Sequence, residues 1–64
     1  MNDFGMTPER IKQIRAKYKL TQEKMARLIN VAHLTYVRWE TGRNVPLPVF
    51  RDKLKELEQD FHQS

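Results

Sequence analysis

The chain has 64 residues, no cysteine, and 12 lysines and arginines against 8 aspartates and glutamates, which gives a net charge of +4. This length limits it to one small domain, and the lack of cysteine excludes disulfides as well as thiolate nucleophiles or metal ligands. No apolar run approaches the roughly 20 residues that cross a bilayer and no signal-peptide pattern opens the chain, so we expect a cytoplasmic protein that does not enter a membrane.

A first helix is predicted to begin just after Thr7. Thr7 can cap the N-terminus, and Pro8 suits the first turn, where its missing N–H costs nothing. Ile11, Ile14 and Tyr18 follow at helical spacing. This helix should therefore bury one stripe and leave most of its lysines in water.

Two shorter helices are predicted between Thr21 and Gly42. Thr21 is a suitable N-cap for a helix that reaches about Ile29, and Asn30 can adopt the left-handed backbone that ends it. The next helix should run from residue 32 or 33 to Glu40, because Gly42 suits the left-handed position after a helix end.

The last helix is predicted to begin at Pro48 and to reach Phe61. Phe50, Leu54, Leu57 and Phe61 recur at helical spacing and form one apolar seam. No segment alternates long enough for a strand, so we expect an all-α, compact bundle of four to five short helices. We place a flexible segment at 1–6, the folded domain at 7–61 and a tail at 62–64.

Positive charge is concentrated in the middle of the chain. Between Arg10 and Arg43 there are nine basic residues and two acidic ones, whereas three basic and four acidic residues follow Arg43. Such a step favours one face for a polyanion and a second region for packing or for a protein partner. A basic protein without a polyanionic partner could carry the same charge, so charge alone leaves both interpretations open.

Residues 22–40 have the composition of two short helices packed at a steep angle. Such a pair needs a small residue where the backbones approach, apolar residues that face inward, and a turn with an unusual backbone. Ala26 supplies the small residue and Asn30 the turn. The apolar set consists of Met25, Ile29, Val31, Tyr36 and Trp39.

The run Leu-Thr-Gln-Glu-Lys-Met-Ala at residues 20–26, with Asn-Val at 30–31 and Arg-Trp-Glu-Thr-Gly at 38–42, resembles the Cro/C1-type (Xre) helix-turn-helix family. The similarity covers roughly residues 10–57. It implies a lambda-repressor-like domain that binds double-stranded DNA with its third helix in the major groove. Two positions depart from the family pattern, since Asn30 replaces a usual glycine and Ala32 a usual serine or threonine cap.

The resemblance places His33, Leu34, Thr35 and Arg38 against base edges. Arg38 can donate two hydrogen bonds to a guanine, and Leu34 can contact a thymine methyl group. His33 suits a guanine or a phosphate, and Thr35 a phosphate. Solvation of Arg38 and a protein contact for Leu34 stay open as alternatives, whereas a metal site at His33 is disfavoured because His62 is the only other histidine.

Family members often join the first helix to the end of the third through an arginine–glutamate bridge, which implies a pair between Arg15 and Glu40. Two unpaired surface charges are the alternative. Contacts to DNA phosphates are expected near the start of the second helix and in the loop after the third. The predicted backbone-contacting residues are Gln22, Lys24, Arg43, Asn44 and Lys19.

A partner surface is expected because one helix-turn-helix contacts only a few base pairs, so two copies usually bind adjacent half-sites. The candidate residues for a dimer or another partner are Phe61, Leu57 and Leu28, although each can also pack internally or lie alone on the surface.

Two hypotheses about function follow from this pattern. The leading one is a homodimeric transcriptional regulator of bacterial or phage type, expected to be a repressor and to lie with the bacterial nucleoid. The alternative is an antitoxin-like or adaptor module with the same fold and a toxin-like protein partner, which the spacing of Pro46 and Pro48 also fits. No nucleophile–base pair, metal cluster or phosphate-cradling loop is apparent, so the sequence predicts neither an enzyme nor a cofactor.

Overall fold

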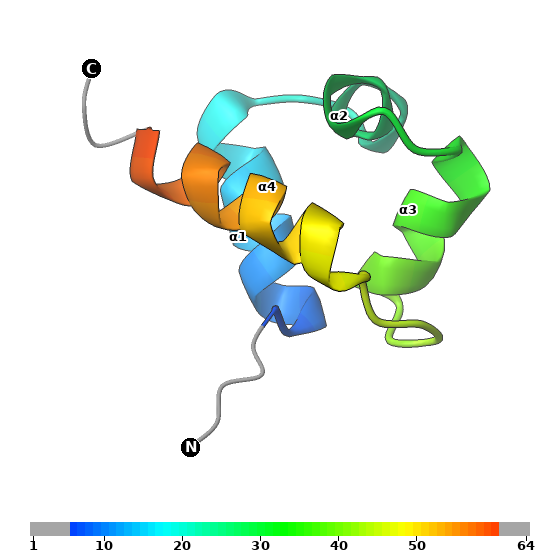
Figure 1. The fold of residues 1–64 in the computed structure, drawn as a ribbon. Helices are drawn as coiled ribbons and strands as arrows, with labels where there is room; N and C mark the ends of the chain where they lie inside the picture. The colour runs from blue at the N-terminus through cyan, green and yellow to red at the C-terminus, as the bar shows by residue number, and fades with distance from the viewer. Residues whose placement is uncertain (1–5, 61–64) are drawn as a thin grey trace.

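The computed structural model describes residues 6–60, which form four α-helices and no strand (Figure 1). They are α1 (Pro8–Tyr18), α2 (Gln22–Ile29), α3 (His33–Glu40) and α4 (Pro48–Asp60). Both α3 and α4 pack against α1 and α2. The predicted all-α class is confirmed. None of these helices is long and apolar enough to cross a membrane.

The first two helices begin with the predicted threonine caps. The hydroxyl of Thr7 accepts a hydrogen bond from the N–H of Arg10, and that of Thr21 accepts one from the N–H of Lys24, each at 3.1 Å. At the far end of α1, Lys19 has a left-handed backbone with φ of 57°. Lysine pays roughly 1–2 kcal/mol for that conformation, so the sequence did not predict it. Its N–H donates to the carbonyl of Ala16 at 3.0 Å, which helps to close the helix.

The turn between α2 and α3 is closed by backbone hydrogen bonds around Asn30. Asn30 has φ of 69°, and its N–H donates to the carbonyl of Arg27 at 3.1 Å. The N–H of Val31 donates to the carbonyl of Ala26 at 2.9 Å. These two bonds form a Schellman motif, which ends a helix and turns the chain in three residues. The left-handed asparagine predicted from the sequence is therefore present.

The core gathers apolar side chains from all four helices. Its largest fully buried side chains include Tyr36 from α3 and Leu54 from α4. Met6 is only 5% exposed and belongs to this core, so its assignment to a flexible segment was wrong. An apolar side chain next to α1 gains more from burial than a free end gains in entropy. Residues 1–5, Phe61 and the 62–64 tail lie outside the described residues.

The C-terminal half of α4 is tied to α1 by polar contacts. The Tyr18 hydroxyl donates to the carbonyl oxygen of Leu57, and the Arg10 guanidinium binds the Glu58 carboxylate through two nitrogens at 3.0 and 2.7 Å. Leu57 is half-buried against the core together with Phe50. Leu57, a candidate partner contact in the sequence, therefore contributes to internal packing.

Ala32→Ser should raise the free energy of unfolding by about 0.5–2 kcal/mol. Ala32 is the N-cap of α3 and provides no side-chain hydrogen bond, whereas a serine hydroxyl can accept one from the first turn. Urea unfolding followed by circular dichroism measures the change. Thr21→Ala is the matched control, because it removes an existing cap and should cost a similar amount. A loss from Thr21→Ala without a gain from Ala32→Ser would contradict this account of the α3 terminus.

Candidate nucleic-acid interface

A buried carboxylate fixes the end of α3. The Glu40 side chain is 2% exposed and pairs with Arg15, whose Nε lies 2.7 Å from Glu40 Oε2. The Gln22 amide donates to Glu40 Oε1 at 3.0 Å, and the Tyr36 hydroxyl donates to Glu40 Oε2. Arg15 also donates to the carbonyl of Leu20 at 3.0 Å. One carboxylate thus holds α1, the start of α2 and the end of α3 in a fixed relation.

The protonation states in this cluster support one another. Burial opposes ionisation of Glu40, but hydrogen bonds from Arg15, Tyr36 and Gln22 outweigh it and lower the pKa of Glu40 below its ordinary value of 4.5. Burial, together with the hydrogen bond to Glu40, raises the pKa of Tyr36. The hydrogen bond to Glu40 also raises the pKa of Arg15. At neutral pH the cluster therefore holds one carboxylate, one guanidinium and one neutral phenol donor.

The two sides of α3 differ sharply in exposure. Tyr36 and Trp39 are 0% and 3% exposed, and their rings meet edge to face with centroids 5.8 Å apart. Leu34 and Arg38 are exposed on the other side, Leu34 at 59%, and His33 is exposed in the first turn of the helix. Thr35, the fourth predicted base-reading residue, is half-buried. Within residues 6–60, the side chains of His33 and Arg38 form no hydrogen bond or ion pair with another residue. No group of acidic and histidine side chains in that range could hold a metal ion.

The loop after α3 folds back onto the end of the helix. Gly42 has φ of 81°, as predicted for the position after the helix. The N–H groups of Arg43 and Asn44 both donate to the carbonyl of Arg38, at 2.9 and 3.3 Å. These bonds hold Arg43 and Asn44, which are both exposed, next to the C-terminal end of α3.

The remaining predicted phosphate contacts surround α2. Lys19 and Lys24 are exposed, at the end of α1 and in the first turn of α2. Gln22 is half-buried, and its amide nitrogen is used in the bond to Glu40. Leu28, a candidate partner contact, is 49% exposed on α2. Lys19 and Lys24 are thus accessible at the surface, whereas Gln22 helps to fix α3 through its hydrogen bond to Glu40.

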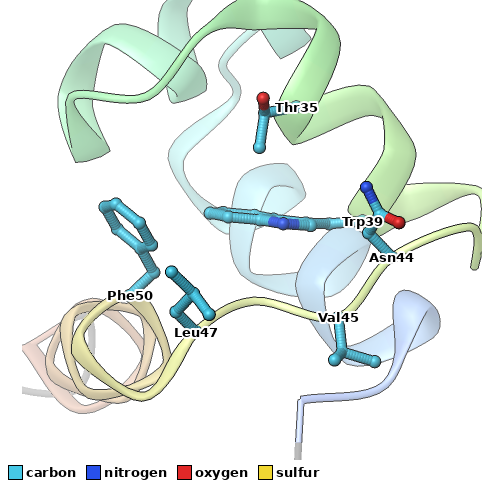
Figure 2. Close-up of a pocket in the computed structure, with 6 residues that line it drawn as sticks. All are labelled: Thr35, Trp39, Asn44, Val45, Leu47 and Phe50. Atoms are coloured by element: carbon cyan, nitrogen blue, oxygen red, sulfur yellow. The ribbon is translucent and has the colours of Figure 1, made fainter.

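An apolar hollow of about 380 Å³ borders this surface, and sequence reasoning missed it. Figure 2 shows the Trp39 indole in its centre, with Thr35 from α3 on one side and Leu47 on the other. Apolar residues in a proline-containing loop were the available signal, but they have no helical spacing that would reveal which side they face. The lining residues are Thr35, Trp39, Asn44, Val45, Leu47 and Phe50.

Comparison with known proteins identifies this arrangement. A family model described as helix-turn-helix matches residues 11–51, from the first turns of α1 into α4. The chain belongs to the Cro/C1-type helix-turn-helix family. This is a family of DNA-binding transcription regulators, and the match contains the whole of α2 and α3.

A relative of known function extends the comparison. The chain is 36% identical over 55 residues to the type II methyltransferase M.MspI of Moraxella sp., a match that covers 86% of this chain and 13% of the methyltransferase. It therefore spans about one eighth of that relative's length. No solved structure matches significantly.

Tyr36→Phe should lower the free energy of unfolding at pH 7 by about 1.5–3 kcal/mol, because Glu40 loses one hydrogen-bond donor to its charged form. In the wild type the pKa of Glu40 is lowered by folding. The ionised Glu40 side chain therefore stabilises the fold fully above about pH 4.5, its ordinary pKa, and this contribution is lost as the pH falls through the lower pKa of the folded state. In Tyr36→Phe the pKa of Glu40 is lowered less, because one hydrogen bond to the carboxylate is missing. The difference between the two proteins should therefore narrow on acidification from about pH 5 to pH 3.

Urea unfolding at a series of pH values measures this difference. Tyr18→Phe is the matched control, since its hydroxyl donates to the neutral carbonyl of Leu57, and its cost should stay constant over the same range. If the cost of Tyr36→Phe were also independent of pH, Tyr36 would not be a donor to an ionised Glu40.

Proposed function

We propose that the chain binds double-stranded DNA sequence-specifically and acts as a transcriptional regulator, namely a repressor. The supporting observation is the two-sided character of α3, with aromatic residues locked in the core and His33, Leu34 and Arg38 turned to solvent. The Glu40 cluster holds that face rigidly. A helix presented in this way fits the major groove, which is wide enough to admit it.

Helix geometry gives the exposed side chains distinct roles. α3 has 8 residues, so it is about 12 Å long and can face three or four base pairs. Leu34 and Arg38 are four residues apart and therefore lie on the same face, about 6 Å apart along the axis. Arg38 reads a guanine and Leu34 a thymine methyl group within about two base pairs of it. His33 and Thr35 complete the base-facing set.

Phosphate contacts set the position of the domain on the duplex. The loop residues Arg43 and Asn44 are exposed next to the C-terminal end of α3, and the N-terminus of α2 offers N–H groups beside Lys24. The positive charge between Arg10 and Arg43 supplies affinity that falls with salt. The backbone-contacting set is Gln22, Lys24, Arg43, Asn44 and Lys19.

We further propose that this domain is a recognition module and does not itself catalyse a reaction. The methyltransferase relative extends far beyond the matched region, which covers 13% of it.

A second candidate function keeps DNA binding and adds a protein partner, as in an antitoxin-like or adaptor protein. It is favoured by the apolar residues Val45, Leu47 and Val49, which are between 64% and 79% exposed.

Arg38→Ala should weaken binding to the preferred duplex by about 1–3 kcal/mol, which is a factor of about 5 to 150 in Kd. The duplex is first selected from a random library with the wild-type protein, and Kd is measured by fluorescence anisotropy. Lys55→Ala is the control, because it removes the same charge from an exposed position on α4. Its affinity should change by less than a factor of about two.

The salt dependence separates the two kinds of contact. For the wild type, log Kd should rise by about 0.9 per log unit of salt for each phosphate contacted. Arg43→Ala should reduce that slope and weaken all duplexes alike, whereas Arg38→Ala should mainly remove the preference for one duplex. A wild-type protein that selects no common sequence would contradict base reading by α3.

Leu34→Ala should remove sensitivity to one thymine methyl group. Replacing each thymine of the selected duplex by deoxyuridine should weaken wild-type binding at one position by about fourfold, since a buried CH₂-sized group contributes about 0.8 kcal/mol. Leu34→Ala should bind both duplexes equally at that position. Leu28→Ala, from the exposed leucine on α2, should keep the wild-type preference. Equal deoxyuridine effects in all three proteins would assign the methyl contact to another residue.

A further inference from the structure

The outward side of α3 combines one cation with apolar side chains. Leu34 is 59% exposed, although its side chain is more stable away from water. Val37, three residues later, is half-buried, and Arg38 is exposed. Residues three and four apart are neighbours on a helix surface. The side chains of Leu34, Val37 and Arg38 therefore form one continuous surface, which we call the outer strip.

Hydrogen-bonding ability is confined to one end of the outer strip. Leu34 and Val37 have no polar side-chain atom, whereas the Arg38 guanidinium has several N–H donors in a planar fork. The Arg38 side chain has no hydrogen-bond or ion-pair partner among the described residues, so the fork is available to a ligand. Against base edges in the major groove, the apolar part of the strip can recognise only methyl groups.

Helix geometry directs the two parts of the strip to adjacent base pairs. Leu34 and Arg38 are about 6 Å apart along the axis of α3. Helical side chains lean toward the N-terminus, so the long Arg38 side chain extends over the turn that contains Leu34. Neighbouring base pairs are about 3.4 Å apart along the duplex. A guanine bound by Arg38 and a methyl group covered by Leu34 therefore belong to neighbouring base pairs.

Two pyrimidines of DNA carry a methyl group at the same place in the major groove. Thymine has it on C5, and cytosine has it there once the base is methylated at C5. The two bases differ at C4, where thymine has an acceptor and cytosine an amino donor. Leu34 and Val37 cannot respond to that difference, because neither forms side-chain hydrogen bonds. The apolar part of the strip is thus selective for the methyl group and indifferent to the pyrimidine that carries it.

We infer that this chain responds to cytosine methylation, because its outer strip accepts a C5-methylated pyrimidine next to the guanine bound by Arg38. The inference rests on the proposed function and names the DNA chemistry that its base-reading face accepts. Methylation of a cytosine at that position strengthens binding. An unmethylated cytosine leaves the Leu34 side chain without its apolar contact. Methylation of the site thereby changes how much of it the protein occupies.

Matched duplexes test the inference. The preferred duplex is first selected with the wild-type protein. The guanine bound by Arg38 is the one at which 7-deazaguanine, which lacks the N7 acceptor, weakens the wild type but not Arg38→Ala. The pyrimidine in each of the two base pairs beside this guanine is then made thymine, deoxyuridine, 5-methylcytosine or cytosine in turn, each with its complementary base. Fluorescence anisotropy measures Kd for every duplex.

The wild type should respond to the methyl group in both kinds of pyrimidine. At one of the two positions, thymine should bind about fourfold more tightly than deoxyuridine, and 5-methylcytosine about fourfold more tightly than cytosine. Each comparison changes only the methyl group and keeps the hydrogen-bonding groups of the base. Equal affinities for 5-methylcytosine and cytosine overturn the inference. A thymine effect that remains in that case limits the contact to thymine.

Two leucine variants assign the effect to the outer strip. Leu34→Ala should bring both ratios to about one, because the alanine methyl does not reach the base. Leu28→Ala removes the same group from an exposed position on α2 and should keep both ratios. Methylation also changes the shape and stiffness of DNA, but a shape effect would persist in Leu34→Ala. Methyl effects that persist in Leu34→Ala, or disappear in Leu28→Ala, overturn the role of the strip.

The selection step separates this inference from the proposed function. A wild type that selects a common sequence through Arg38, but is indifferent to both methyl groups, overturns the inference and leaves the proposed function supported. A wild type that selects no common sequence, from either an unmethylated library or one with 5-methylcytosine at every cytosine, overturns both.

Discussion

The geometry of this small domain depends on the carboxylate of Glu40. Burying a single charge costs several kcal/mol unless donors surround it, and here the donors come from α1 (Arg15), the start of α2 (Gln22) and α3 itself (Tyr36). Each donor is satisfied only when the three helices have one relative position. The apolar core can tolerate small displacements of its helices, since hydrophobic contacts are not directional. The charged cluster cannot, and it therefore sets the angle at which α3 is presented.

Local chemistry made the helices predictable, because caps and helix ends depend on neighbouring residues. The hydroxyls of Thr7 and Thr21 accept hydrogen bonds from N–H groups in the first turn of each helix, as expected for N-cap residues. Asn30 and Gly42 have left-handed backbones, as their residue types imply. The pairing of Arg15 with Glu40 came from the family resemblance alone, since the two are 25 residues apart. The sequence predicts that Tyr36 lies in the core, but no local signal indicates that its hydroxyl donates to Glu40.

What the sequence could not predict depends on contacts between distant segments. The left-handed Lys19 is tolerated because the chain must turn there toward α2, and tertiary packing overrides the preference of lysine. Met6 has no helical spacing to mark it as a core residue, yet it is covered. The hollow beside Trp39 likewise depends on how the loop after α3 and the start of α4 pack around the indole. No pattern within α3 reveals that arrangement. The sequence predicts the apolar seam of α4, but only the structure shows that Leu57 packs against the core.

The residues that hold α3 and the residues that it presents are different sets. An isolated helix of 8 residues is unstable in water, and this one has no side-chain cap at its start, so its stability comes from Tyr36, Trp39 and Glu40. His33, Leu34 and Arg38 add almost nothing to that stability, since they are exposed and make no side-chain hydrogen bond within the described part of the chain. Substituting them changes what the surface can bind at little cost to folding. A fixed scaffold with an independently variable exposed face is the physical reason why one small fold can serve many binding functions.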